Sequence, residues 1–276
     1  MLDKSLDAIP AEAWGPSVIR QIRDEVKTFI LAGHETSASM LTWSLYEIFC
    51  PHNKDILAKV REEGTSTQTH STTDSVAQSL SRSLTDSLRC SLTHSLTHSH
   101  TDSLAWLSIG RTIYNGHTST VGSRSKVTSL PSKEVLDNLK YTENCLLESL
   151  RKYSNVPTVV RKAAQDVKLG EYFIPKGATI MVNMQGVHHN PEFWPEPMVY
   201  KPERHFGMYK PYTFLPFIDG NRKCLGHLLS RLESKVVLSM LVQNYDFQIT
   251  NPDEAGLKHA YMIPIIPKNG HHMKVL

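Results

Sequence analysis

The chain has 276 residues, of which 40% are hydrophobic and 21% are charged. This composition supports a packed globular core and excludes a wholly disordered or fibrous protein. The net charge of +3 comes from 30 basic and 27 acidic residues that are mixed along the chain, so it does not support a nucleic-acid-binding protein.

The cysteines lie far apart, and no two of them form a Cys-x-x-Cys pair. They are Cys50, Cys90, Cys145 and Cys224. This spacing favours neither a disulfide framework nor a zinc site, and it predicts a reducing compartment. The N-terminal residues are too charged for a signal peptide, and no run reaches the ~18 to 20 apolar residues of a membrane span. The sequence therefore predicts no membrane anchor within the chain as given.

The segment Ser17–Cys50 contains one glycine, Gly33, and no proline. Apolar residues recur in it at intervals of three and four, at Ile19, Ile22, Val26, Phe29 and Ile30. This period predicts a single helix of about 50 Å that Pro51 terminates. The alternative of a membrane helix is disfavoured because His34 and Glu35 interrupt the apolar run.

A second helix is predicted over Asn53–Glu63, with Ile56, Leu57 and Val60 on its buried face. The composition then changes, because 35 of the 68 residues from Thr65 to Ser132 are Ser, Thr or His. Residues 79–104 repeat the pattern Ser-Leu-x-x, which predicts disorder and suggests a translated repeat or a retained intron. Histidines 94, 98 and 100 of this repeat could bind a metal ion, but we interpret them as solvated.

Order is predicted to resume at Lys133, with a helix that ends near Lys152. Beyond it, the sequence predicts a hairpin over Val167–Pro175, a strand over Ala178–Met184, an irregular segment over Pro191–Pro216, a helix over Cys224–Gln243, and strands around Phe247 and over Met262–Ile266. The chain thus divides into a helical part (1–64), a low-complexity part (65–132) and a mixed part (133–276).

The most informative motif lies at the start of the last predicted helix. It contains Phe217, Gly220, Arg222, Cys224 and Gly226. A cysteine at a helix N-terminus has a stabilised thiolate, an arginine nearby adds to this effect, and glycines allow a flat ligand to approach the backbone. The alternative is that Cys224 is a small buried hydrophobic residue.

This Phe-x-x-Gly-x-Arg-x-Cys-x-Gly motif resembles the haem-binding loop of the cytochrome P450 monooxygenases. The resemblance implies that Cys224 is the thiolate ligand of a haem iron, with Phe217, Gly220 and Gly226 around the cofactor. It also implies a mainly α fold with a small β component, in which a long central helix crosses the haem.

Glu148 and Arg151 are similar to the family's Glu-x-x-Arg motif. Three residues apart on a helix, they lie on one face and can form an ion pair, for which an exposed surface pair is the alternative. The resemblance implies a buried triad with Arg204, which lies in the proline-rich segment. His205 stands where the family usually has phenylalanine, and we expect it to weaken the packing there.

Ala32, Gly33, Glu35 and Thr36 resemble the family's Ala-Gly-x-Asp/Glu-Thr motif on the opposite side of the haem. The resemblance implies that the small residues leave room for O2 and that Glu35 and Thr36 deliver protons. The alternative for Thr36 is a hydrogen bond to a carbonyl of its own helix.

Two arginines, Arg161 and Arg222, occupy positions at which the family binds the haem propionates. His188 also resembles a family position, and we assign it no catalytic role. The basic residues Lys223, Arg231 and Lys235 could attract an acidic redox partner, with a solvated helix face as the alternative.

The resemblance implies insertion of one oxygen atom of O2 into a lipophilic substrate, with electrons from NADPH through a reductase or ferredoxin. It covers about 200 residues and corresponds to the C-terminal half of the family's chain, so membrane association is expected only through an N-terminal part absent here. We expect the endoplasmic reticulum membrane, with plastid or cytoplasm as alternatives. A competing hypothesis is a catalytically inert fragment, and a histidine-rich metal-binding protein ranks lower.

Overall fold

The computed structural model describes residues 15–68, 131–250, 259–260, 264–268 and 270–276. Its helices are α2 (Pro16–Phe49), α3 (Lys54–Gln68), α6 (Lys133–Asn138), α7 (Lys140–Tyr153), α8 (Met184–His188) and α9 (His227–Asn244). Its 3₁₀ turns are η2 (Pro51–Asn53), η5 (Pro202–Phe206) and η6 (Gly220–Arg222). Its strands are β1 (Thr158–Lys162), β2 (Val167–Leu169), β3 (Tyr172–Ile174), β4 (Thr179–Asn183), β5 (Phe247–Ile249), β6 (His259–Ala260), β7 (Ile266–Pro267) and β8 (Met273–Val275). The expected mainly helical fold with a small β component is confirmed.

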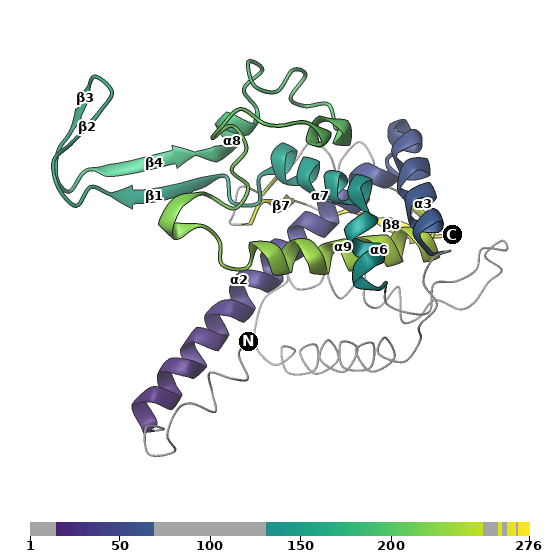
Figure 1. The fold of residues 1–276 in the computed structure, drawn as a ribbon, viewed down its shortest axis with the longest axis horizontal. Coiled ribbons are helices and arrows are strands. Elements are labelled where there is room, and N and C mark those ends of the chain that lie inside the picture. Colours follow the sequence, from purple (N-terminus) through teal and green to yellow (C-terminus); the bar gives the residue numbers. More distant parts are fainter. Residues whose placement is uncertain (1–14, 69–130, 251–258, 261–263, 269) are drawn as a thin grey trace.

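The long helix predicted from the apolar period is present as α2. It ends where expected, because Cys50 has the extended backbone (φ −63°, ψ 134°) that a residue before proline prefers. The second half of α2, from Ser37 onward, is buried, whereas the first half is exposed and projects from the body of the molecule (Figure 1). In the described residues, no helix is long and apolar enough to cross a membrane.

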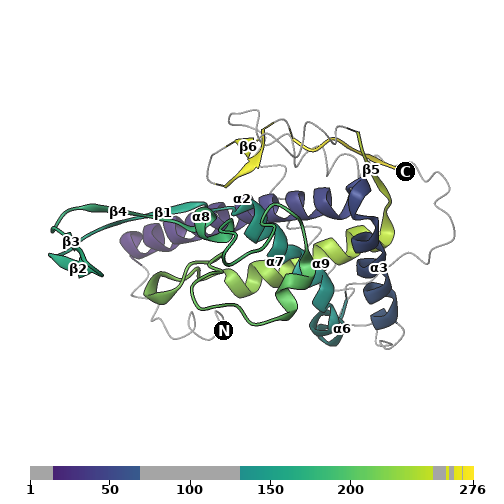
Figure 2. The same cartoon turned by 90° about the horizontal axis from the view of Figure 1, so that it is seen from above.

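The core forms where the buried half of α2 packs against α7 and α9 (Figure 2). Trp43 lies at its centre with 0% of its surface exposed. Its ring stacks on Tyr153 of α7 at 3.8 Å between centroids, and its indole nitrogen donates to the carbonyl of Ile265 at 3.1 Å. One side chain therefore fixes α2, α7 and the C-terminal segment together.

The helix expected from Lys133 to Lys152 is in fact two helices, α6 and α7, which are separated at Leu139 (φ −75°, ψ 69°). Glu63 of α3 explains the break, because its carboxylate accepts the backbone N–H groups of Tyr141 (2.6 Å) and Thr142 (2.8 Å). A helix start has free N–H groups that favour a negative charge, so Glu63 caps α7 from a different part of the chain.

Replacing Glu63 by alanine should lower the free energy of unfolding by about 1–2 kcal/mol, because two backbone donors lose their partner. Chemical denaturation followed by circular dichroism measures this loss. The matched control is the exposed neighbour Glu62, whose replacement by alanine should change stability by less than about 0.5 kcal/mol. Equal effects of the two variants would contradict the capping role.

The strands form antiparallel pairs among the described residues: β1 with β4, β2 with β3, β5 with β8, and β6 with β7. The hairpin predicted around Gly170 is confirmed as β2 and β3, and Gly170 has the positive φ of 59° that this turn requires. The extended run expected from Ala178 is confirmed as β4. Of the strand expected over 262–266, residues 262 and 263 lie outside the described residues, and Ile266 begins β7.

The second helix was expected to end at Glu63 and disorder to begin at Thr65, but α3 continues to Gln68, so residues 65–68 are helical. Residues 69–130, including His94, His98 and His100, lie outside the described residues, so the disorder expected there stays a prediction.

Replacing residues 69–130 by a short Gly/Ser linker should leave the fold intact, because α3 and α6 contact each other on either side of this segment. A shorter loop costs less closure entropy, so the free energy of unfolding should stay unchanged or rise by up to about 2 kcal/mol. Thermal unfolding of both chains measures the difference. A shortened chain without cooperative unfolding would show that the segment is part of the core.

Candidate functional site

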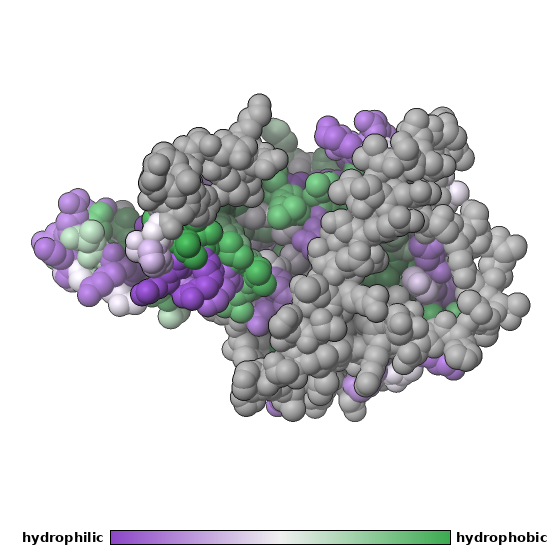
Figure 3. Space-filling model, turned by 90° about the horizontal axis from the view of Figure 1, so that it is seen from below, coloured by the Kyte–Doolittle hydropathy of each residue, from purple (hydrophilic) through white to green (hydrophobic). Residues whose placement is uncertain are grey.

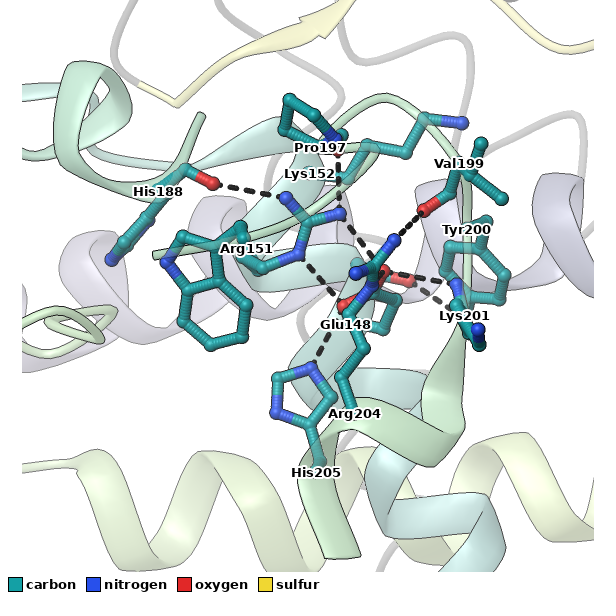
Figure 4. A network of polar contacts seen from close by, with 12 residues as sticks. Glu148, Arg151, Lys152, His188, Pro197, Val199, Tyr200, Lys201, Arg204 and His205 are labelled. Carbon is teal, nitrogen blue, oxygen red and sulfur yellow. Dashed lines mark hydrogen bonds and ion pairs between the residues drawn. The ribbon is translucent and has the colours of Figure 1, made fainter. Parts of the chain in front are cut away.

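Glu148 and Arg151 form a fully buried ion pair on α7, and each has 0% of its side chain exposed. The Arg151 Nε and Nη2 atoms donate to the two carboxylate oxygens of Glu148, both at 2.8 Å (Figure 4). The alternative of a surface pair is therefore wrong. Burial alone would raise the pKa of Glu148, but hydrogen bonds from Arg151 and His205 outweigh it and hold this pKa below its ordinary value.

The remaining hydrogen bonds of Arg151 bind α8 and the irregular segment that follows it. Its Nη1 donates to the carbonyl of His188 at 2.9 Å, and its Nη2 donates to the carbonyl of Pro197 at 2.7 Å. Its guanidinium lies over the ring of Trp194 at 5.4 Å from the centroid. Arg151 therefore joins α7 to the segment that leads toward Cys224.

Arg204 completes the expected triad from η5. Its Nε lies 3.4 Å from Glu148 Oε1, which makes an ion pair without the geometry of a hydrogen bond. Its guanidinium also donates to the carbonyls of Glu196 (2.8 Å) and Val199 (3.3 Å). The backbone N–H of Lys201 donates to the same Glu148 oxygen at 2.9 Å. Glu148 thus holds η5 against α7.

The expectation that His205 weakens the packing is wrong. Its Nε2 lies 2.8 Å from Glu148 Oε2, and its Nδ1 is hydrogen-bonded to the hydroxyl of Tyr209. The ring also lies against Trp194, at 5.9 Å between centroids, and against Phe214, at 5.1 Å. Burial lowers the pKa of His205 more than Glu148 raises it, so the ring is neutral and donates Nε2–H to Glu148. His205 therefore joins the ionic cluster as a fourth side chain, which the motif alone did not indicate.

The cysteine loop turns tightly between Phe217 and α9. The Cys224 N–H donates to the Phe217 carbonyl at 2.9 Å, and the Lys223 N–H donates to the Gly220 carbonyl at 3.0 Å. Both Ile218 (φ 59°) and Gly220 (φ 78°) have left-handed backbone, which is a strained state for a β-branched residue. A backbone held in this way leaves the Cys224 thiol exposed, so it is not the small buried hydrophobic residue of the alternative interpretation.

The expected position of Cys224 at the helix N-terminus needs correction. Helix α9 begins at His227, three residues beyond Cys224, and Gly226 is its N-cap. The N–H of Cys224 is also already bonded within the loop. The loop's own hydrogen bonds therefore position this cysteine, and the first turn of α9 does not contain it.

The segment expected on the side of the haem opposite Cys224, residues 32–36, lies where α2 leaves the core. Residues 32–35 are exposed and Thr36 is half-buried. A Cβ atom added to Gly33 would meet nothing within 4 Å, so open space faces this part of the helix. The Thr36 hydroxyl donates to the carbonyl of Ala32 at 2.7 Å, which is the alternative raised for it from the sequence.

Figures 1 and 2 show the loop before α9 beside the part of α2 that leaves the core. Large apolar side chains are exposed on both elements. They are Phe29, Ile30 and Leu31 on α2, Leu225 in the loop, and Leu228, Leu229 and Leu232 at the start of α9. In the view from below, green apolar and purple polar residues lie side by side at the left, where the arm of β1 to β4 and the exposed half of α2 project (Figure 3). Exposed apolar side chains near a free thiol fit a large apolar ligand with a soft metal.

The two predicted propionate-binding arginines are both exposed. Arg161 lies on β1 opposite Ile180 of β4, and its guanidinium donates to the carbonyl of Val160 at 2.9 Å. Arg222 lies in η6, two residues before Cys224. Their roles stay predictions.

The basic residues expected to attract a redox partner are placed differently from one another. Arg231 and Lys235 of α9 both pair with Glu143 of α7, and Lys235 also donates to the carbonyl of Leu136 at 3.1 Å. Arg231 and Lys235 are therefore paired with a carboxylate of the same chain, whereas the side chain of Lys223 is exposed. The described residues contain no group of three or more His, Cys, Asp and Glu side chains that could hold a metal ion.

Comparison with known proteins adds independent information. The family model of the cytochromes P450 matches residues 15–85 and 113–272. Cytochrome P450 4c21 of Blattella germanica is 28% identical over 96% of this chain and 42% of its own length. Lithocholate 6-beta-hydroxylase of Mesocricetus auratus is 33% identical over 54% of this chain and 31% of its own length. The chloroplastic protein LUTEIN DEFICIENT 5 of Arabidopsis thaliana is 27% identical over 83% of this chain and 30% of its own length.

The chain spans less than half of the length of each of these relatives. The family match nevertheless covers most of the chain and includes α2, the Glu148–Arg151 pair and the cysteine loop. This chain belongs to the cytochrome P450 family.

Proposed function

We propose that this chain carries the haem-thiolate part of a monooxygenase, which inserts one oxygen atom of O2 into a lipophilic substrate. The observation that carries the proposal is the exposed Cys224 thiol in a braced loop that lies beside α2 (Figures 1 and 2), together with the exposed apolar side chains of α9 and α2. A thiolate sulfur, apolar surfaces and open space at Gly33 suit a haem, which is flat and mainly apolar.

When bound, a haem with a thiolate ligand supplies the redox chemistry that activates O2. Cys224 would be the ligand, with Phe217, Gly220 and Gly226 holding the loop around it. Arg161 and Arg222 would bind the carboxylates of the cofactor through charge-assisted hydrogen bonds. Electrons would come from NADPH through a reductase or ferredoxin.

On the other side, Ala32 and Gly33 would leave room for O2, and Glu35 and Thr36 would deliver protons. The Thr36 hydroxyl donates to its own helix at 2.7 Å, so it can donate elsewhere only after it leaves the Ala32 carbonyl. The exposed Glu35 carboxylate can exchange protons with water. We also propose attachment to the endoplasmic reticulum membrane, with plastid or cytoplasm as alternatives.

A thiol-protection experiment tests the proposal. Cys50 and Cys145 are buried, so alkylation in a Cys90→Ser background should label Cys224 first. Haem should block this labelling, because a sulfur bound to iron cannot react. Haem uptake that leaves Cys224 fully reactive, or a failure to take up haem, would contradict the proposal.

The alternative function is a catalytically inert member of the family. It is favoured by the exposure of the apolar residues of α2 and α9, which would cover a haem only in part. NADPH consumption with a reductase and a lipophilic substrate separates the two. Haem protection of Cys224 without product formation would favour the inert protein.

A further inference from the structure

His188 is a buried imidazole at the end of α8, and both of its ring nitrogens are hydrogen-bonded. Only 1% of the residue is exposed. The backbone N–H of Leu215 donates to its Nε2 at 2.8 Å, and its Nδ1 lies 2.9 Å from the hydroxyl oxygen of Ser154. Its backbone carbonyl accepts from Arg151 at 2.9 Å (Figure 4). The residue therefore connects α7, α8 and the segment that leads to the cysteine loop.

The direction of each hydrogen bond follows from the groups involved. A backbone N–H can only donate, so Nε2 of His188 accepts and carries no proton. Burial and the nearby charge of Arg151 lower the pKa of His188 to about 3, so the single ring proton lies on Nδ1. Nδ1–H then donates to Ser154, whose hydroxyl donates to the carbonyl of Arg151 at 3.2 Å. The hydrogen bonds therefore run in one donor-to-acceptor direction, from the Leu215 N–H through His188 and Ser154 to the Arg151 carbonyl of α7.

Leu215 lies at the entry of the cysteine loop. Its carbonyl accepts the N–H of Ile218 at 3.2 Å, and the carbonyl of Phe217 accepts the N–H of Cys224 at 2.9 Å. The ring of Phe214, which precedes Leu215, packs beside His188 at 5.5 Å between centroids. A shift of Leu215 therefore moves the backbone that carries the sulfur.

We propose that His188 is a positioning residue that fixes the cysteine loop, and with it Cys224, relative to the Glu148–Arg151 pair. The relevance of Cys224 rests on the proposed function, but the contacts of His188 do not require a bound cofactor. Arg151 binds the backbone carbonyl of residue 188, so this bond persists in any side-chain variant. Substitution of His188 thus isolates the contribution of the ring.

Two variants separate the two ring contacts. The amide of glutamine reaches about as far as Nε2, so His188→Gln keeps an acceptor for the Leu215 N–H. The amide of asparagine reaches about as far as Nδ1, so His188→Asn keeps the donor to Ser154 and leaves the Leu215 N–H without its acceptor. The Asn variant should loosen the cysteine loop and the Gln variant should not.

Amide hydrogen exchange of the chain without haem measures this difference. We expect exchange of residues 215–224 to be at least tenfold faster in His188→Asn and less than threefold faster in His188→Gln, with the α2 and α7 peptides unchanged in both. A uniform increase over the whole molecule, or equal exchange in the two variants, would show that His188 only fills the core.

Ser154→Ala provides a milder variant if His188→Asn fails to fold. It removes the acceptor of Nδ1–H but keeps the Nε2 contact to Leu215, so it should accelerate exchange of residues 215–224 by less than threefold, as His188→Gln does, with the rest of the chain unchanged. Exchange there that is tenfold faster or more would overturn the proposal, because the loop would then loosen while its contact to the ring is kept. If the loop loosens as expected but the wild-type chain does not bind haem, the role of His188 stands and the proposed function fails.

Discussion

Replacing Glu148 by glutamine should lower the free energy of unfolding by about 3–5 kcal/mol. The change removes one negative charge and leaves the fully buried Arg151 without its counter-ion, and an unpaired buried charge is among the most destabilising single defects. Arg204, His205 and the N–H of Lys201 lose a charged acceptor at the same time. Denaturant unfolding at neutral pH measures the loss.

The exposed ion pair between Lys133 and Asp137, at 3.4 Å, is the matched control. Asp137→Asn should cost less than about 0.5 kcal/mol, because water screens this pair. The double variant Glu148→Leu/Arg151→Met should lose less unfolding free energy than the two single variants lose in sum. The reason is that neither of the two positions then carries an unpaired buried charge. Additive losses would show that the two side chains do not act as a pair.

Acid should destabilise the chain below pH 6.5, with His188 as a major contributor. The unfolded imidazole takes up a proton near its ordinary pKa of 6.5, whereas burial holds the folded pKa at about 3. Between these values the unfolded state binds more protons, so stability falls as the pH falls. A difference of this size corresponds to about 5 kcal/mol between pH 6.5 and pH 3.

The groups around His188 act in the same direction. Burial comes first among the causes, and the charge of Arg151 also opposes protonation of the ring, as does positive charge on His189 or His205 once acid protonates them. His188→Gln removes the titrating group and should flatten the profile of unfolding free energy against pH over this interval. An unchanged profile would show that other groups carry the acid sensitivity.

The sequence predicted best what nearby residues determine. The apolar period and Pro51 define α2, Gly170 defines the hairpin, and the three-residue spacing of Glu148 and Arg151 places them on one helix face. Each of these features depends on residues close together in the chain, and local patterns report them directly.

What the sequence did not predict depends on contacts between distant residues. The break at Leu139 follows from Glu63, which lies on the other side of the low-complexity segment. His205 was expected to weaken the packing, yet its ring meets Glu148, 57 positions earlier. The ring contacts of His188 likewise join residues 154 and 215. A local sequence pattern does not show which distant residue a side chain will contact, because glutamate and histidine with similar neighbours also occur on solvent-exposed surfaces.

The central claim is that the sulfur of Cys224 binds a haem iron, and the spectrum of the reduced, carbon monoxide-bound chain tests it most directly. Thiolate ligation predicts a Soret band at about 450 nm in the wild-type chain and its loss in Cys224→Ser. A wild-type chain that takes up haem without this band, or a serine variant that retains it, would contradict the claim.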